Sequence, residues 1–278
     1  MIDINSIKII YRRLRVKFKE DGLVRVVREG IRFYVYQRIL IKCIRYIVPK
    51  HIISLPETPS FYGDRFATVH HVGFLHDENF TTAFKNSVSE VPKHLAEHAY
   101  HNIAWRGHIC TWAATQALAL KEGAFIECGV WYGILSKKIC EYTRFENTDR
   151  EFFLTDSWGK TEGSHPNSNY HPDIYETVKR RFSQYPNVHL IRGLVPDTLS
   201  KITTKKIAYL AIDMNGVEPE RAALEYFYHK IVPGGIIYFD DYGWGGFPEL
   251  GATINQFFEN KPENLLHFPS GNSIVIKH

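Results

Sequence analysis

The sequence predicts a doubly wound α/β fold with a mostly parallel sheet and an N-terminal helical extension. After Gly123, short apolar runs alternate with helical stretches, which is typical of consecutive βαβ units. The chain has 278 residues and is 44% hydrophobic and 23% charged, enough for one large domain with a sizeable core and an extension. No apolar run approaches the ~20 residues that a membrane-spanning helix needs.

The N-terminal third is expected to differ from the rest of the chain. In residues 5–49, apolar residues recur between Arg and Lys, which predicts one or two amphipathic helices. Residues 50–90 contain prolines and many polar residues and are expected to form a linker or irregular cap. A helical pattern follows from residue 92 to 120. We therefore assign residues 1–90 to the extension and residues 91–278 to the α/β domain.

The strands of the α/β domain are predicted from six apolar segments. These are AFIECGV, EFFLTD, VHLIRG, IAYLAID, GGIIYFDD and SIVIKH. Helices are expected between them, from about Tyr132 and near residues 173–184, 218–230 and 249–259. The last segment follows closely on LLHF, so we expect an antiparallel pair at one edge of the sheet.

Charge is distributed unevenly along the chain. Residues 1–50 hold 13 Lys and Arg against 4 Asp and Glu, a balance of +9, whereas the remaining residues have a balance of −5. This asymmetry indicates an anionic partner for the segment. Two interpretations stay open: peripheral contact with the inner membrane face, or an arm that packs on the body or on a second subunit of a homo-oligomer.

Other patterns narrow the class of protein. The four cysteines have no C-x-x-C spacing, which favours cytoplasmic thiols over disulfides or a zinc site. The start of the chain lacks the pattern of a secretory signal peptide, so we expect a cytoplasmic protein. Nucleic-acid binding is not expected, because the basic residues lie outside the α/β domain and no recognition motif is present.

Candidate binding residues lie where the predicted strands end, since ligands of doubly wound sheets bind beyond the carboxyl ends of the strands. The first strand ends in Glu127 and a turn that contains Gly129 and Gly133. Glycines allow close approach of a ligand to the backbone, and the next helix offers free N–H groups. The G-x-x-x-G spacing departs from the G-x-G-x-x-G pattern of dinucleotide sites, and a purely structural turn is the alternative.

The second strand ends in Asp156, followed by Ser157. An acid at this place can accept hydrogen bonds from both hydroxyls of an adenosine ribose. The alternative is that the Asp-Ser pair caps a turn or helix.

Three further acids are expected to converge at the same edge. Asp213 ends the fourth strand, and Asp240 and Asp241 end the fifth. Parallel neighbours finish at one edge of a sheet, and clustered carboxylates repel one another unless they are protonated or bind a cation. Oxygen ligands of this kind suit Mg²⁺. Turn and cap residues are the alternative.

Two more residues are candidates for less specific reasons. The polar loop 159–172 follows the second strand and could form a lid over the site, with His171 as general base or simply as an exposed histidine. Arg106 precedes the first strand on a predicted helix. It could border the carboxylate of a cofactor or belong to an ordinary polar helix face.

Taken in order, five landmarks resemble the class I, Rossmann-like S-adenosylmethionine methyltransferases. The resemblance is specifically to the macrocin O-methyltransferase family, which includes mycinamicin and novobiocin sugar methyltransferases, and it spans roughly residues 100–278. The landmarks are ECGVWYG at 127–133, TDSW at 155–158, IRGLVPDTL at 191–199, IDMN at 212–215 and VPGGIIYFDDYG at 232–243.

The resemblance implies a transferase that uses S-adenosylmethionine and Mg²⁺ to methylate a sugar hydroxyl of a glycan, glycolipid or glycosylated metabolite. Glu127 and Gly129 would contact the methionine end of the cofactor and Asp156 its ribose. From their positions in the sequence, we add Gly133, Ser157 and Arg106 as candidate cofactor-binding residues. The metal ligands would be Asp213, Asp240 and Asp241, and Asp213 is the first candidate for the base that takes the hydroxyl proton.

The loop after the fourth predicted strand departs from the family pattern. The family shows D-G-D-x-Y there, whereas this chain has Asp213-Met214-Asn215-Gly216, so the second acid is an amide. The first acid, a proposed metal ligand, is kept. The amide at Asn215 changes what this loop can offer to the substrate and leaves open whether the metal is required. The alternatives are methylation of a phenol or another non-sugar hydroxyl, and a non-catalytic scaffold with a membrane-binding basic arm. The missing G-x-G-x-x-G argues against a nicotinamide oxidoreductase.

Overall fold

The computed structural model describes residues 60–64, 66–159 and 171–278. Residues 58–278 form one compact unit, and the division of the chain into an extension and an α/β domain at residue 90 stays a prediction. The expected helices of residues 5–49 and most of the predicted lid loop lie outside the described residues. Within the part that is described, no helix is both long and apolar enough to cross a membrane.

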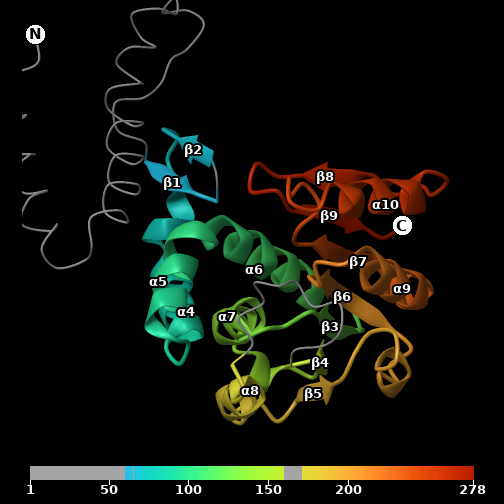
Figure 1. The fold of residues 1–278 in the computed structure, drawn as a ribbon, viewed down its shortest axis with the longest axis horizontal. Helices are drawn as coiled ribbons and strands as arrows, with labels where there is room; N and C mark the ends of the chain where they lie inside the picture. Colours follow the sequence, from blue (N-terminus) through green and yellow to red (C-terminus); the bar gives the residue numbers. More distant parts are fainter. Residues whose placement is uncertain (1–59, 65, 160–170) are drawn as a thin grey trace, which may run out of the picture. The chain divides into compact units, whose positions relative to one another are not determined.

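The unit is built on a seven-stranded sheet of order β5-β4-β3-β6-β7-β9-β8 (Figure 1). All pairs from β5 to β7 are parallel, and β9 pairs antiparallel with both β7 and β8. The prediction of a mostly parallel, doubly wound sheet with an antiparallel edge is therefore confirmed. The strands are β3 (Ala124–Cys128), β4 (Phe152–Asp156), β5 (Val188–Arg192), β6 (Ile207–Ile212), β7 (Ile231–Phe239), β8 (Leu265–His267) and β9 (Ser273–Ile276).

The direction of the chain reverses between two central strands. From β3 the chain moves outward through β4 and β5, and it then returns to place β6 on the other side of β3. Every residue of β3 and of β6 is buried, as expected for parallel strands covered on both faces. Doubly wound folds bind ligands at such a reversal, which here lies at the carboxyl ends of β3 and β6.

Helices cover the two faces of the sheet separately (Figure 1). One core joins Phe125, Phe152 and Tyr209 of the sheet to the helices before β6, and a second joins Leu210 and Phe239 to the helices after it. The first group is α4 (Glu78–Val88), α5 (Lys93–Asn102), α6 (Ala104–Leu118), α7 (Ile134–Thr143) and α8 (Ile174–Phe182), and the second is α9 (Val217–Phe227) and α10 (Pro248–Phe258).

The interpretation of residues 50–90 as a linker or irregular cap is wrong for residues 78–88, which are helical. The helix α4 begins after Asp77, whose side-chain Oδ1 accepts a hydrogen bond from the backbone N of Asn79 at 2.9 Å. Phe80 and Phe84, one turn apart, are buried against the core. The prediction was based on the prolines and polar residues of the whole stretch, and the short amphipathic pattern within it was missed.

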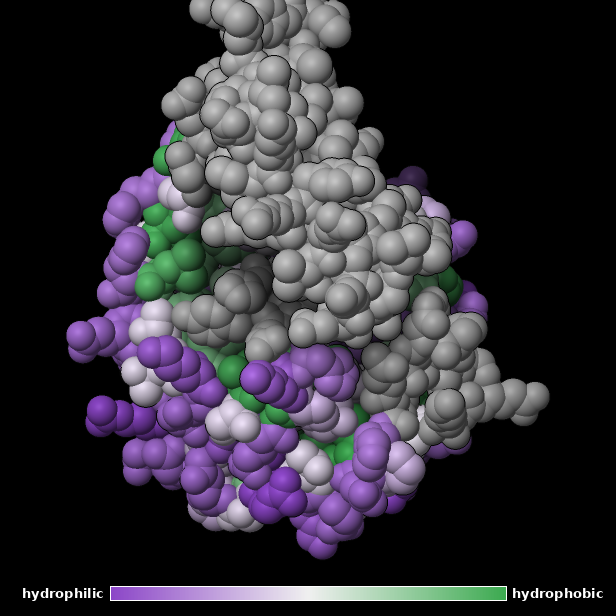
Figure 2. All heavy atoms as spheres, turned by 60° about the vertical axis from the view of Figure 1, so that its left-hand side comes forward, coloured by the Kyte–Doolittle hydropathy of each residue, from purple (hydrophilic) through white to green (hydrophobic). Residues whose placement is uncertain are grey.

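A small hairpin precedes α4. Its strands, β1 (Phe61–Gly63) and β2 (Phe66–Thr68), pair antiparallel around a turn that contains Asp64. The rings of Phe61 and Phe66 lie 6.2 and 5.8 Å from that of Trp105 on α6, which anchors the hairpin to this helix. Figure 2, in which the left-hand side of Figure 1 comes forward, shows hydrophobic side chains in patches among hydrophilic ones. Tyr62 of β1 is 60% exposed.

The helix predicted from about Tyr132 begins later, at Ile134. Gly133 adopts φ +68°, in the left-handed region, so the chain cannot enter the helix before this residue. The other helices of the domain lie close to their predicted ranges, with a 3-10 turn from Tyr228 to Lys230 extending α9.

Candidate functional site

The turn after β3 contacts the end of β6. Gly129 has φ +88°, and a Cβ added to it would lie 1.7 Å from the carbonyl oxygen of Asp213. The backbone N of Asp213 donates to the carbonyl oxygen of Cys128 at 2.8 Å. Gly133 is similarly confined, because a Cβ there would lie 2.5 Å from the ring of Phe182. Both glycines are required by close packing at these positions, and their contact with a cofactor stays a prediction.

Asp156 holds this turn in place. Its Oδ2 accepts hydrogen bonds from the backbone N atoms of Val130 and Trp131 at 2.7 and 2.8 Å, and its Oδ1 accepts one from Trp158 N at 2.8 Å. The Oγ of Ser157 donates to Gly159 O at 3.2 Å and lies 3.4 Å from Asp156 Oδ1. The capping role that the sequence left as an alternative is thus present; ribose binding by Asp156 and cofactor contact by Ser157 stay predictions.

Glu127 is buried at the end of β3 with an unmatched acceptor. Among the described residues, its Oε2 has no hydrogen-bond partner, although the atom is inaccessible to water. Burial raises the pKa of this carboxyl to about 8, and Asp240 and Asp156 add repulsion. A buried acceptor of this kind fits a ligand that brings a charged N–H donor, such as the amino group of S-adenosylmethionine.

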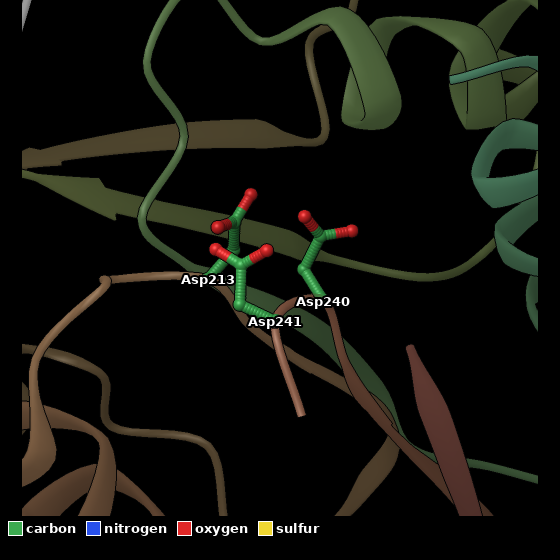
Figure 3. A group of neighbouring side chains, drawn as sticks. All are labelled: Asp213, Asp240 and Asp241. Carbon is green, nitrogen blue, oxygen red and sulfur yellow. The ribbon is translucent and has the colours of Figure 1, made fainter. Parts of the chain in front are cut away.

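The three acids predicted to converge do so. One side-chain oxygen from each of Asp213, Asp240 and Asp241 lies within 4.8 Å of the other two. In Figure 3 the carboxylates project to the same side, from the ends of two neighbouring strands, β6 and β7. Burial and repulsion by the other two acids raise the pKa of Asp213 well above its usual range, and burial and Asp240 raise that of Asp241 to about 6. We call these three residues the acid cluster.

Arg106 lies against the acid cluster. From α6, its Nη1 forms ion pairs with Asp240 Oδ2 and, at 3.1 Å, with Asp241 Oδ1. Its Nε and Nη2 lie 2.7 and 3.2 Å from the carboxylate oxygens of Asp64. The sequence left two interpretations of Arg106, a contact with the carboxylate of the cofactor or an ordinary polar helix face. In the structure its guanidinium contacts carboxylates of this chain, and the cofactor contact stays a prediction. The helix position was correct, but its partners lie 42 or more residues away in the chain and leave no local signal.

Sequence reasoning missed two other residues beside the acid cluster. Tyr238, buried on β7, donates its hydroxyl hydrogen to Asp240 Oδ1. Glu220, buried in the first turn of α9, accepts a hydrogen bond from Met214 N at 3.2 Å. Burial raises the pKa of Glu220 to about 7. The sequence places Glu220 in the first turn of the helix that follows β6. Because helix N-termini favour carboxylates, this position could have predicted a role for Glu220 near the end of that strand.

His171 lies at the border of the described residues. Its side chain is 67% exposed, and its Nδ1 accepts a hydrogen bond from Asp173 N at 3.3 Å, just before α8 begins. The exposed-loop interpretation fits this placement. The role of general base stays a prediction, since residues 160–170 before it are outside the described part.

Comparisons with known proteins identify the family and agree with the fold. The sequence model of the macrocin-O-methyltransferase (TylF) family matches residues 113–262. Among curated protein sequences, none matches the chain.

Several solved structures share the fold. The O-methyltransferase NovP is 20% identical, with 62% of this chain and 79% of NovP covered and a TM-score of 0.52. The Podospora anserina methyltransferase PaMTH1, solved with S-adenosylhomocysteine, is 16% identical over 73% of this chain and 88% of its own, with a TM-score of 0.52. CalS11, a calicheamicin methyltransferase, is 17% identical over 75% and 94%, with a TM-score of 0.50. At these identities the likeness shows the fold alone.

Proposed function

The chain belongs to the macrocin O-methyltransferase family, and from this membership we propose that it methylates a sugar hydroxyl with the help of a divalent cation. As a member, it is an S-adenosylmethionine-dependent O-methyltransferase. The observation that carries the cation part is the acid cluster at the carboxyl ends of β6 and β7, beside the glycine turn. The sugar part rests on the sequence resemblance to sugar methyltransferases of the family.

S-adenosylmethionine would lie over the glycine turn after β3. The unmatched Oε2 of Glu127 would accept a hydrogen bond from the amino group of its methionine end, and Gly129 keeps the turn close to β6. Asp156 would support the cofactor site by fixing the turn through its two hydrogen bonds from the backbone N atoms of Val130 and Trp131. Its predicted contact with the ribose would use remaining acceptor capacity of the carboxylate.

The acid cluster fits a divalent cation by charge. Three carboxylates face one another, and within the described residues Arg106 is the only side chain that forms an ion pair with them. The pKa values of Asp213 and Asp241 are raised first by burial and then by repulsion from neighbouring carboxylates, and a bound cation would offset that repulsion. A cation held by Asp213, Asp240 and Asp241 would lower the pKa of an acceptor hydroxyl and orient it.

Asp213 is the proposed base. It lies at the end of β6, where the turn after β3 also arrives, so it is close to both the proposed cofactor site and the acid cluster. Its carboxylate would take the hydroxyl proton while the acceptor oxygen bonds to the methyl carbon and the bond from that carbon to sulfur breaks. Rate enhancement would come chiefly from positioning the acceptor in line with the sulfonium methyl.

Asn215 replaces the second acid of the family pattern in this loop. It has φ +55°, a backbone conformation that Asn tolerates better than most residues. An amide at this position can donate as well as accept a hydrogen bond, so we propose that it contacts the acceptor and not the cation.

Methyl transfer from radiolabelled S-adenosylmethionine tests the proposal directly. The full chain would be incubated with nucleotide-linked sugars, glycosides and a catechol, each with Mg²⁺ or with EDTA. Sugar labelling that requires Mg²⁺ is the expected result. Labelling of the catechol alone would favour the non-sugar alternative. Failure of calorimetry to detect binding of S-adenosylmethionine or S-adenosylhomocysteine would overturn the enzymatic proposal and favour a scaffold.

The charge of residues 1–50 supports a separate proposal, an anionic membrane surface as their partner. Co-sedimentation of the full chain with anionic vesicles, lost on deletion of residues 1–50, is expected. Unchanged sedimentation after the deletion would end the idea, and loss of self-association instead would favour the subunit-arm interpretation.

A further inference from the structure

We infer that Arg106 is a built-in counter-charge that competes with a divalent cation for the acid cluster, and that Asp64 limits this competition by binding the same guanidinium. Arg106 is then a positioning residue that sets how tightly the site holds metal. The inference deepens the proposed function and rests on its cation-assisted part.

The contacts of Arg106 place its charge on two of the three proposed ligands. Its Nη1 bridges Asp240 Oδ2 and Asp241 Oδ1, the latter at 3.1 Å, and also lies 3.3 Å from the backbone oxygen of Asp240. The side chain is 7% exposed, so water screens these interactions weakly. A cation that bound the same two oxygens would have the guanidinium as its immediate neighbour.

Asp240 is the ligand for which the competition is sharpest. Its Oδ1 accepts the hydrogen bond from Tyr238, whose own oxygen accepts one from Asn272 Nδ2 at 3.1 Å. Its Oδ2 is paired with Arg106. Both carboxylate oxygens are therefore engaged by this chain. Binding a cation would require Asp240 Oδ2 to share its lone pairs with Arg106 or to release it.

Asp64 draws the guanidinium in the opposite direction. Its two oxygens lie 2.7 and 3.2 Å from Nε and Nη2 of Arg106, the two-pronged arrangement that suits an arginine and a carboxylate. The hairpin that carries Asp64 packs through Phe61 and Phe66 on Trp105, the residue directly before Arg106. The hairpin thus fixes Asp64 against Arg106 and leaves only Nη1 for the acid cluster.

The two residues should change metal affinity in opposite directions. Neutralising Arg106 removes a positive charge next to the cation and should raise metal affinity. Neutralising Asp64 frees the guanidinium of Arg106 to pair more strongly with the acid cluster and should lower metal affinity. A charge at 4–6 Å changes an ionisation constant by roughly 1–3 powers of ten, and we expect changes of metal affinity near the lower end of that range.

The experiment measures Mn²⁺ binding to the full-length protein by the loss of its free-ion electron paramagnetic resonance signal, with Mg²⁺ calorimetry as a second probe. The variants are Arg106→Gln, Arg106→Lys and Asp64→Asn. Arg150→Gln is the matched control, because Arg150 is also buried and paired with an aspartate. It lies before β4, at the amino ends of the parallel strands, whereas the acid cluster lies at their carboxyl ends. Thermal unfolding of each variant confirms that it is folded.

We expect Arg106→Gln to bind Mn²⁺ about tenfold more tightly than wild type, Asp64→Asn to bind it about tenfold more weakly, and Arg150→Gln to match wild type. Arg106→Lys keeps the charge and should stay within a few-fold of wild type. If Arg106→Gln binds equally or more weakly while wild type binds well, the competition is refuted and the proposed function stands. If no protein binds either ion, the cation-assisted part of the proposed function falls together with the inference, while binding of S-adenosylmethionine still tests the transferase itself.

Discussion

The α-carbon of Gly129 faces the carbonyl oxygen of Asp213 so closely that a Cβ would lie 1.7 Å from that oxygen. This contact joins the proposed cofactor turn to the first residue of the acid cluster. The two halves of the site therefore pack against each other through their backbones at the reversal of the sheet.

Gly129→Ala is expected to destabilise the protein by about 3 kcal/mol or more, because it adds a clash with backbone to an unfavourable φ of +88°. Binding of S-adenosylhomocysteine should be lost as the turn shifts. Gly245→Ala is the control, since nothing lies within 4 Å of its added Cβ. Urea unfolding and calorimetry measure both effects, and a Gly129→Ala protein with wild-type stability would contradict the packing described.

Asp156→Asn tests the capping role. The carboxylate of Asp156 accepts hydrogen bonds from backbone N–H groups with both of its oxygens. Asparagine keeps one of these acceptors and replaces the other with an N–H₂ group, which cannot accept from a backbone N–H. Unsatisfied buried donors cost about 1–3 kcal/mol, so the free energy of unfolding should fall by that amount even without ligand. Unchanged stability with weakened cofactor binding would instead assign Asp156 to the ribose alone.

The sequence predicted those parts of the site that follow from topology. Asp213, Asp240 and Asp241 end neighbouring parallel strands, so their convergence needed only the order of the elements. The pairing of Arg106 with Asp64 could not be predicted, because it depends on how a short hairpin packs on α6. The same applies to α4, whose burial is decided by tertiary contacts with α7 and not by composition.

Asp240→Asn should separate the two halves of the site by function. Removing one charged ligand is expected to lower kcat about a hundredfold and to abolish the stimulation by Mg²⁺. The proposed cofactor contacts come from the β3 turn, so the affinity for S-adenosylmethionine should change less than threefold. Initial rates with and without EDTA, with calorimetry of the cofactor, provide the measurement. Equal loss of cofactor binding would mean that the two sites are not separate.

Glu127→Gln should change how stability depends on pH. The folded-state pKa of Glu127 is raised to about 8 from an ordinary 4.5, so the native protein holds a proton that the unfolded chain releases. Its contribution to stability is complete below pH 4.5 and is lost as the pH rises toward 8.

The glutamine variant should therefore match wild type at pH 4.5 and exceed it at pH 8 by a few kcal/mol at most, since one pKa unit corresponds to about 1.4 kcal/mol. Asp241 and Glu220 also have raised pKa values and are present in both proteins. The pKa of Asp213 is raised in part by Glu127, so it should fall slightly in the variant. Denaturant unfolding without ligand at several pH values gives the comparison. A constant difference between the proteins from pH 5 to 8 would show that Glu127 does not titrate in this range.

Lys138 offers a test of the core away from the site. Its side chain is fully buried on α7, with Nζ 3.2 and 3.9 Å from the ring centroids of Phe80 and Phe84. Among the described residues, Nζ has no hydrogen-bond partner. Burial lowers the pKa of this amine to about 6, so the folded protein holds it largely neutral at pH 7.

Lys138→Met is expected to stabilise the protein by a few kcal/mol at pH 7, because methionine fills the same space without an unpaired amine. The depressed pKa penalises folding increasingly as the pH falls from 10.5 to about 6, so the gain should be largest near pH 6 and vanish near pH 10.5. Lys137→Met is the neighbouring control: Lys137 Nζ donates to Arg181 O at 3.0 Å and pairs with Glu141 at 3.1 Å, so its loss should destabilise. A Lys138→Met protein that is less stable than wild type at pH 6 would show that the cation–π contacts outweigh the cost of burying the amine.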